Sequence, residues 1–126
     1  MKTLNIIASA YRATVEEQDD TVVWICHAMK GAGADIEVLL RGNAVNYAVR
    51  GQNAKGLTFG SWSQTQPPHI EHDVSSLCAK GVVVHLLDED LARRGLDKVP
   101  LIEGVYRVRG AALPAFLAGF ERVWHW

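Results

Sequence analysis

The chain has 126 residues, of which 48% are hydrophobic and 21% are charged. This length and composition are typical of one globular domain, here residues 1–126, and they exclude a disordered chain and a coiled coil. With 13 Lys and Arg residues against 14 Asp and Glu residues the net charge is -1, so we expect neither nucleic acid nor a membrane surface as a partner.

The N-terminal segment and the cysteines indicate where the protein works. The first apolar run is interrupted by Asn5 and followed by acidic residues, unlike a signal peptide. No stretch approaches the ~20 continuous apolar residues that cross a bilayer. We therefore expect a soluble, cytoplasmic protein in which Cys26 and Cys78 are free thiols.

The first half of the chain alternates between strand and helix patterns. Residues 4–10 form a compact apolar run that predicts a buried strand. Residues 16–33 have apolar side chains at helical spacing, acidic residues at the start and glycines at the end, which predict a long helix. Residues 36–40 predict a second strand, and residues 44–49 a short helix.

A long segment rich in glycine, proline and polar residues follows. Residues 51–68 predict a long loop that includes Phe59 and Trp62. A structureless connection of this length usually carries function or binds a partner.

The second half continues the alternation. Residues 70–78 predict a helix, residues 82–87 a buried strand, and residues 88–94 a helix with acidic residues at its start and arginines near its end.

Three further elements complete the chain. Residues 104–109 predict a strand, residues 111–120 a helix with Pro114 in its first turn, and residues 122–126 a terminal strand.

This alternation predicts an α/β fold, a three-layer α/β/α sandwich with a mainly parallel sheet of four to five strands. Ligands of such sheets bind beyond the carboxyl ends of the strands, which selects the loops at residues 9–14, 41–43, 85–88 and 109–111.

Several common signatures are absent from the sequence. The loop at residues 9–14 has no glycine, which excludes a dinucleotide fingerprint or a P-loop. Residues 60–64 lack the second glycine of a serine nucleophile elbow. His69 and His72 could present two imidazoles to one metal, but the sequence places no third ligand. We expect no cofactor and no metal.

Three segments, Val38-Leu-Leu-Arg-Gly-Asn-Ala-Val45, residues 81–95 and residues 104–110, follow one another in a characteristic order. They are a strand with a glycine turn, a strand with a short helix ending in Arg-Gly, and a strand before a helix and the terminal Arg122-Val-Trp124. In order and spacing the chain resembles the DsrE-like family, which includes the DsrE, DsrF and DsrH subunits and the TusB, TusC and TusD subunits of sulfur relay.

The resemblance implies a DsrEFH-like fold and a role in intracellular sulfur transfer. It also implies a homo-oligomer, as a dimer, trimer or hexamer, and a sulfur-relay protein as a partner. The family's sulfur carriers place a cysteine at the end of the third strand, and here that position falls at or beside Leu87. Because leucine cannot carry sulfur, the resemblance implies an accessory protein rather than a direct carrier.

The two cysteines differ in their sequence context. Cys26 shares a helical stripe with Val22 and Met29, which is typical of a small buried hydrophobe. Cys78 also fits a core position, but Lys80 lies close enough to favour a thiolate, while the helix C-terminus disfavours one. Cys78 therefore remains a candidate catalytic thiol.

The other candidate site residues lie at the strand ends. His85 in the third strand is either a core or interface histidine, or a catalytic or ligand-binding group. Arg12, Asn43 and Asp88 are candidate ligand-binding residues. The alternative to sulfur transfer is a non-catalytic module that binds a small molecule or a protein in this crevice, and neither interpretation favours an enzyme.

Aromatic side chains gather near the C-terminus. Tyr106, Trp124 and Trp126 fit packing or subunit contact, because aromatic residues are enriched in interfaces.

Overall fold

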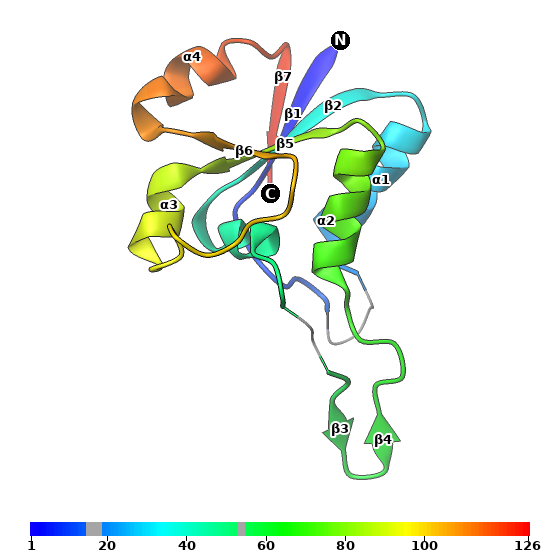
Figure 1. Ribbon diagram of the computed structural model, residues 1–126. Helices are drawn as coiled ribbons and strands as arrows, with labels where there is room; N and C mark the ends of the chain where they lie inside the picture. Colours follow the sequence, from blue (N-terminus) through cyan, green and yellow to red (C-terminus); the bar gives the residue numbers. More distant parts are fainter. Residues whose placement is uncertain (15–18, 53–54) are drawn as a thin grey trace.

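The computed structural model describes residues 1–14, 19–52 and 55–126. In chain order its elements are β1 (Lys2–Ile7), α1 (Thr21–Gly31), β2 (Asp35–Leu40), the 3-10 helix η1 (Gly42–Ala48), β3 (Thr58–Phe59), β4 (Trp62–Ser63), α2 (Ile70–Ala79), β5 (Val83–Leu87), α3 (Asp88–Arg93), β6 (Val105–Val108), the 3-10 helix η2 (Gly110–Ala112), α4 (Leu113–Leu117) and β7 (Arg122–His125) (Figure 1).

The predicted α/β sandwich is confirmed. A five-stranded sheet has the order β6-β5-β2-β1-β7, and each neighbouring pair is parallel. Figure 1 shows α1 and α2 together on one side of this sheet and α4 on the other. All five parallel strands therefore end at one carboxyl edge.

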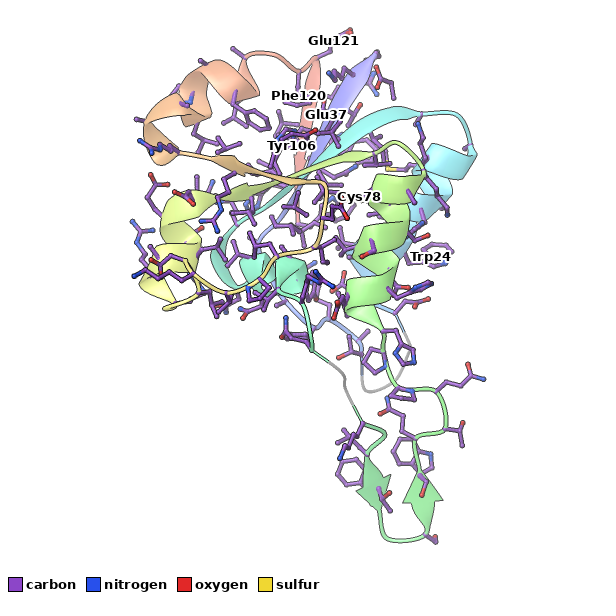
Figure 2. The ribbon with its side chains drawn as sticks, viewed as in Figure 1. Trp24, Glu37, Cys78, Tyr106, Phe120 and Glu121 are labelled. Atoms are coloured by element: carbon purple, nitrogen blue, oxygen red, sulfur yellow. The ribbon has the colours of Figure 1, made fainter. Side chains whose placement is uncertain are left out.

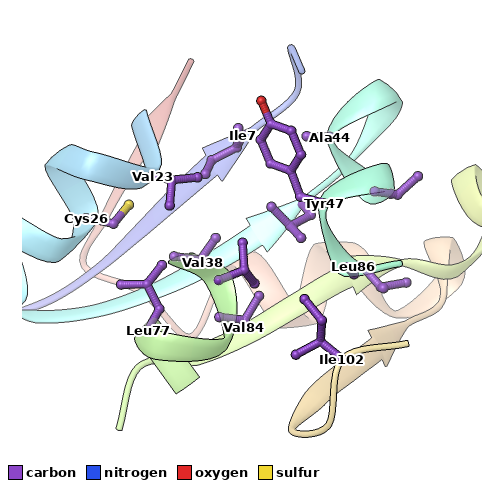
Figure 3. Close-up of a cluster of buried hydrophobic side chains, with 14 of the residues drawn as sticks. Ile7, Val23, Cys26, Val38, Ala44, Tyr47, Leu77, Val84, Leu86 and Ile102 are labelled. Carbon is purple, nitrogen blue, oxygen red and sulfur yellow. The ribbon is translucent and has the colours of Figure 1, made fainter. Parts of the chain in front are cut away.

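The two faces of the sheet are covered unequally. On the α1 and α2 face, alternate residues of the central strands, among them Val38 and Val84, join a large buried cluster that includes Tyr47 of η1 (Figure 3). On the other face, a smaller cluster of Leu4, Ile6 and Leu39 packs against side chains from the α4 segment. Burial on both faces explains why these strands appear as continuous apolar runs.

Helix α1 begins later than predicted. The expected helix covered residues 16–33, of which residues 16–18 lie outside the described residues. Asp20 is extended, with φ of -69° and ψ of 130°, and its Oδ1 atom accepts hydrogen bonds from the backbone N–H groups of Val22 at 2.9 Å and Val23 at 3.1 Å. Because an N-cap residue lies outside the helix, the acidic pair before Thr21 does not form its first turn.

The segment at residues 51–68 is not wholly a loop, contrary to the prediction. Strands β3 and β4 pair as an antiparallel hairpin that extends away from the sheet (Figure 1). The aromatic rings of Phe59 and Trp62 are stacked with centroids 5.8 Å apart, and Gly60 has a positive φ of 59°. A two-residue Gly-Ser turn between aromatic residues is a hairpin signal, because glycine adopts positive φ without strain.

Smaller differences occur at the two ends of the chain. The first strand ends at Ile7, before the predicted end at Ala10. The predicted helix at residues 111–120 consists of η2 followed by the short helix α4, with Pro114 in its first turn. Within residues 1–14, 19–52 and 55–126, the helices are all too short or too polar to span a membrane.

Candidate functional site

A cavity of about 370 Å³ lies beyond the carboxyl ends of β1 and β2. Its walls come from the loop after β1, from η1, from the segment carrying the hairpin and from the start of α2. The lining residues are Tyr11, Thr14, Tyr47, Gln52, Lys55, Leu57, Gln64, Pro68, Ile70 and Glu71. A cavity at the carboxyl edge of a parallel sheet is where α/β proteins place their ligands.

A buried hydrogen-bond network supports the inner wall. The hydroxyl of Tyr47 donates to Oδ2 of Asp20 at 2.6 Å, and the backbone N–H of Tyr11 donates to the same hydroxyl oxygen. Asp20 and Tyr47 are both buried. Burial raises the pKa of Tyr47, and the hydrogen bond and negative charge of Asp20 raise it further. Tyr47 is therefore a neutral hydrogen-bonding group and not a phenolate at physiological pH.

The loop after β1 is held in an unusual conformation beside this network. Tyr11 and Ala13 have positive φ values of 59° and 56°, which are uncommon for residues other than glycine. The backbone N–H of Arg12 donates to Oδ2 of Asp20 at 3.2 Å. The ring of Tyr11 packs edge-on against Tyr47 with centroids 5.2 Å apart. Strain of this kind persists where surrounding contacts fix the backbone, as they do at many binding sites.

Two glutamine side chains fix the outer wall. Gln52 accepts a hydrogen bond from the hydroxyl of Tyr11 at 3.0 Å and donates to the backbone oxygen of Val49 at 3.2 Å. Gln64 donates to the backbone oxygen of Thr14 at 3.1 Å, which connects the end of the hairpin to the loop after β1. The hairpin is therefore joined to the cavity wall by a side-chain hydrogen bond.

Of the predicted ligand-binding residues, Arg12 lies in the loop after β1, between the lining residues Tyr11 and Thr14 in sequence. Its guanidinium donates to Oγ of Ser9 at 3.1 Å. Asn43 lies at the start of η1, where its Oδ1 atom accepts hydrogen bonds from Arg94 at 2.8 and 3.1 Å. Neither side chain lines the cavity itself.

Asp88 and His85 lie elsewhere. Asp88 forms an ion pair with Arg107 at 2.9 Å. His85 faces the α4 side of the sheet, where its Nε2 atom lies 2.7 Å from Oε1 of Glu37 and its ring packs against Phe116 with centroids 4.7 Å apart. The structure therefore does not bring His85 and Asp88 together with Arg12.

Neither thiol belongs to the lining of the cavity. Cys78 lies near the end of α2, before the turn that leads into the amino end of β5, whereas Leu87 is the last residue of that strand. Burial raises the pKa of the Cys78 thiol. Cys26 is fully buried among core residues, and burial followed by the charge of Asp20 raises the pKa of its thiol to about 12. Neither cysteine lines the cavity or lies at the carboxyl end of β5.

A separate polar cluster lies under α4. Glu37 is paired with both Lys2 and His85. Figure 2 shows Glu37, Tyr106 and Phe120 on the α4 side of the sheet, away from Cys78. This cluster and the cavity lie in different parts of the molecule.

Comparison with solved structures places this arrangement among known folds. The YchN protein from E. coli aligns over 100% of both chains with a TM-score of 0.71 and 19% sequence identity. The chain has a YchN-like fold. MTH1491 from Methanobacterium thermoautotrophicum, described as a protein of unknown function, aligns over 96% of both chains with a TM-score of 0.64 and 17% identity.

The α/β sandwich that the family resemblance implies is confirmed, and it matches the fold of YchN. At these identities the likeness concerns the fold alone. No family model and no curated protein sequence matches the chain.

Sequence reasoning missed most of the cavity wall. Tyr11 lay in a selected strand-end loop but was not singled out, and Tyr47 was hidden within a short apolar helix. The sequence signal that could have indicated this site is the presence of one tyrosine in the segment after the first strand, Tyr11, and one in the segment after the second strand, Tyr47. Among residues 1–14, 19–52 and 55–126, no three His, Cys, Asp or Glu side chains form a group suited to a metal ion, and His69 and His72 are exposed.

Proposed function

We propose that the protein takes part in intracellular sulfur transfer as an accessory component that acts beside a sulfur-relay protein without carrying sulfur itself. The YchN-like fold supports the connection to sulfur relay. The residue at the end of β5, Leu87, has no group that could bond to sulfur, which supports the accessory role.

The position of the thiols is the observation that carries this proposal. Sulfur transfer between proteins needs an accessible thiolate. Cys26 is buried with a pKa raised to about 12, and Cys78 lies at the opposite end of β5 from Leu87 with its pKa also raised. Both thiols are therefore poor acceptors of a persulfide sulfur.

Intact-mass measurement after incubation with polysulfide tests the chemistry. We expect no sulfur addition to the native protein and none to a Cys78→Ser variant. The gain of one sulfur by the native protein, abolished in Cys78→Ser, would show that Cys78 is a carrier and would overturn the proposal.

A reconstituted relay tests the accessory role. With a persulfidated DsrE-like carrier and its acceptor, the protein should change the rate of sulfur transfer while its own mass stays constant. An unchanged rate, together with no complex in size-exclusion chromatography, would contradict a role in this process.

We also propose that the protein assembles as a homo-oligomer. Tyr106 of β6 and Trp124 of the edge strand β7 are exposed, at 60% and 38% of their surface, and aromatic residues are enriched in interfaces. Light scattering should give a mass of at least two chains, and a monomer at high concentration would refute this assembly. Tyr106→Asp with Trp124→Asp should dissociate the oligomer, because buried unpaired carboxylates disfavour an interface.

A second candidate function is a non-catalytic binding module that takes a small molecule. The observation that favours it is the cavity between the loop after β1 and the start of α2, since its volume falls within the range of small-molecule sites. A thermal-shift screen over anions, nucleotides and apolar rings tests this function. A raised melting temperature with at least one class supports binding, and a flat response to all of them contradicts it.

A further inference from the structure

The polar groups in the cavity wall are largely engaged with the protein itself. Both polar atoms of the Gln52 amide hydrogen bond within the chain, to Tyr11 on one side and to backbone oxygens on the other. Gln64 is used in the same way, since its Oε1 atom accepts from the backbone N–H of Leu57 at 3.3 Å while its amide donates to Thr14. A ligand that needed these amides would first have to break existing hydrogen bonds.

The phenol groups follow the same pattern. The hydroxyl of Tyr47 donates to Asp20 and accepts from the backbone of Tyr11, and the hydroxyl of Tyr11 donates to Gln52. What Tyr11 offers to the cavity is therefore mainly the surface of its ring, whereas Tyr47 is only 1% exposed. Replacing an existing internal hydrogen bond by one to a ligand gives little net free energy.

Apolar surface makes up much of the remaining wall. Leu57, Pro68 and Ile70 line the cavity together with the ring of Tyr11. Tyr11 and Leu57 are 48% and 43% exposed, and both line the cavity. Covering such surface with an apolar ligand contributes roughly 25 cal/mol for each Å² removed from water.

The charged residues of the wall do not select a charged ligand. Lys55 and Glu71 have opposite signs, so they provide no net attraction for an anion or a cation. One carboxylate oxygen of Glu71 already accepts a hydrogen bond from the backbone N–H of Gly51 at 2.8 Å.

We propose that this cavity binds a small, neutral, largely apolar molecule with an aromatic ring that packs against Tyr11. The proposal rests on the second candidate function above and assigns its ligand class. Aromatic rings favour edge-to-face or offset-stacked contacts, and Tyr11 already makes one such contact with Tyr47.

A titration with two ligands of equal shape tests the ligand class. Indole and purine are fused rings of similar size, but purine has several additional ring nitrogens that need hydrogen-bond partners. Each is added to nitrogen-labelled full-length protein while backbone amide signals are followed by NMR. We expect indole to give saturable shifts centred on Tyr11, Thr14 and Gln52, with purine binding at least about tenfold more weakly because its polar atoms lose water without gaining partners.

Variants locate the binding site. Tyr11→Ala removes the ring and should weaken indole binding roughly tenfold, while Trp24→Ala, which removes an exposed aromatic ring on α1 away from the cavity lining, should leave it unchanged. Leu57→Ser gives a second test with an exposed residue, in case Tyr11→Ala disturbs the fold, and it too should weaken binding.

The outcomes separate the ligand class from the binding function. Purine binding at these residues as tightly as indole would overturn the apolar ligand class but support a binding module. Indole shifts that do not saturate, or that lie outside the cavity, would overturn the ligand class. If the thermal-shift screen is also flat, the second candidate function fails with it.

Discussion

The hydroxyl of Tyr47 and the carboxylate of Asp20 are joined by a hydrogen bond of 2.6 Å between two buried side chains. Asp20 is also the N-cap of α1, through Val22 and Val23. The carboxylate of Asp20 therefore caps α1 at the end of the loop after β1, and it also orients Tyr47 in the cavity wall. Local helix capping and the shape of the candidate site depend on one buried charge.

Tyr47→Phe should lower the free energy of unfolding by about 1–3 kcal/mol, because it leaves the buried Oδ2 of Asp20 and the N–H of Tyr11 with one partner fewer. Urea denaturation followed by circular dichroism measures the change. The control is Ser61→Ala, which removes a hydroxyl at an exposed position in the hairpin turn, with an expected change within about 0.5 kcal/mol. If Tyr47→Phe changes the free energy of unfolding by no more than about 0.5 kcal/mol, as expected for the control, the buried hydrogen bond contributes no net stability.

The central strands of the sheet could be predicted from sequence because each one is marked by a pattern of neighbouring residues. Each central strand is a short apolar run bounded by polar or glycine residues, and burial on both faces produces this pattern directly. The hairpin was missed because β3 and β4 have two residues each and lie within a segment rich in glycine and proline. A strand of that length shows no periodicity.

The candidate site could not be predicted in the same way, because it depends on contacts between distant segments. Tyr11 and Tyr47 are 36 positions apart, and only the pairing of β1 with β2 brings their loops together. The separation of Cys78 from Leu87 follows from chain direction. A helix that leads into β5 ends at the amino end of the strand, whereas Leu87 ends the strand at its carboxyl end.

Glu37 should make stability depend on acid pH. Burial alone raises the pKa of Glu37, but hydrogen bonds from Lys2 and His85, together with their charges, outweigh it and lower the pKa below its usual value. As the pH falls, the carboxylate of Glu37 therefore becomes protonated in the unfolded chain before it does so in the folded protein. The contribution of Glu37 is present above the pKa of an unfolded glutamate, about 4.3, and is lost as the pH falls through the lower folded value.

Comparison with Glu37→Gln tests this dependence. At neutral pH the native protein should be more stable than the variant, and the difference in unfolding free energy should shrink as the pH is lowered below about 4.3. Urea denaturation at several pH values gives the two curves. Glu103→Gln, at an exposed position, serves as the control. A difference between native protein and Glu37→Gln that grows on acidification would show that the pKa is raised instead.

The two thiols should differ in their reaction with iodoacetamide. In the native protein at mildly alkaline pH, Cys26 should remain unmodified, because it is fully buried and its pKa is raised to about 12. Cys78 is partly exposed but also has a raised pKa, so it should react more slowly than a free thiol.

Mass spectrometry of the labelled peptides measures both rates, with urea-unfolded protein as the reference in which both cysteines react. Native Cys78→Ser should take up no label. Rapid labelling of Cys26 in the native state would mean that the core around α1 opens readily.

The hairpin should contribute little to the free energy of unfolding. The smaller core cluster between the sheet and the α4 segment should contribute much more. Trp62 is exposed on the hairpin, so Trp62→Ala should change the free energy of unfolding by no more than about 0.5 kcal/mol. Leu39 of β2 is fully buried in the cluster that packs against the α4 segment, so Leu39→Ala should lower the free energy of unfolding by about 2–5 kcal/mol through lost burial and a new cavity. Thermal and urea denaturation at low protein concentration compare the two variants. A large loss for Trp62→Ala under those conditions would show that its ring supports the folded chain, and a small loss for Leu39→Ala would show that the α4 segment closes over the space left behind.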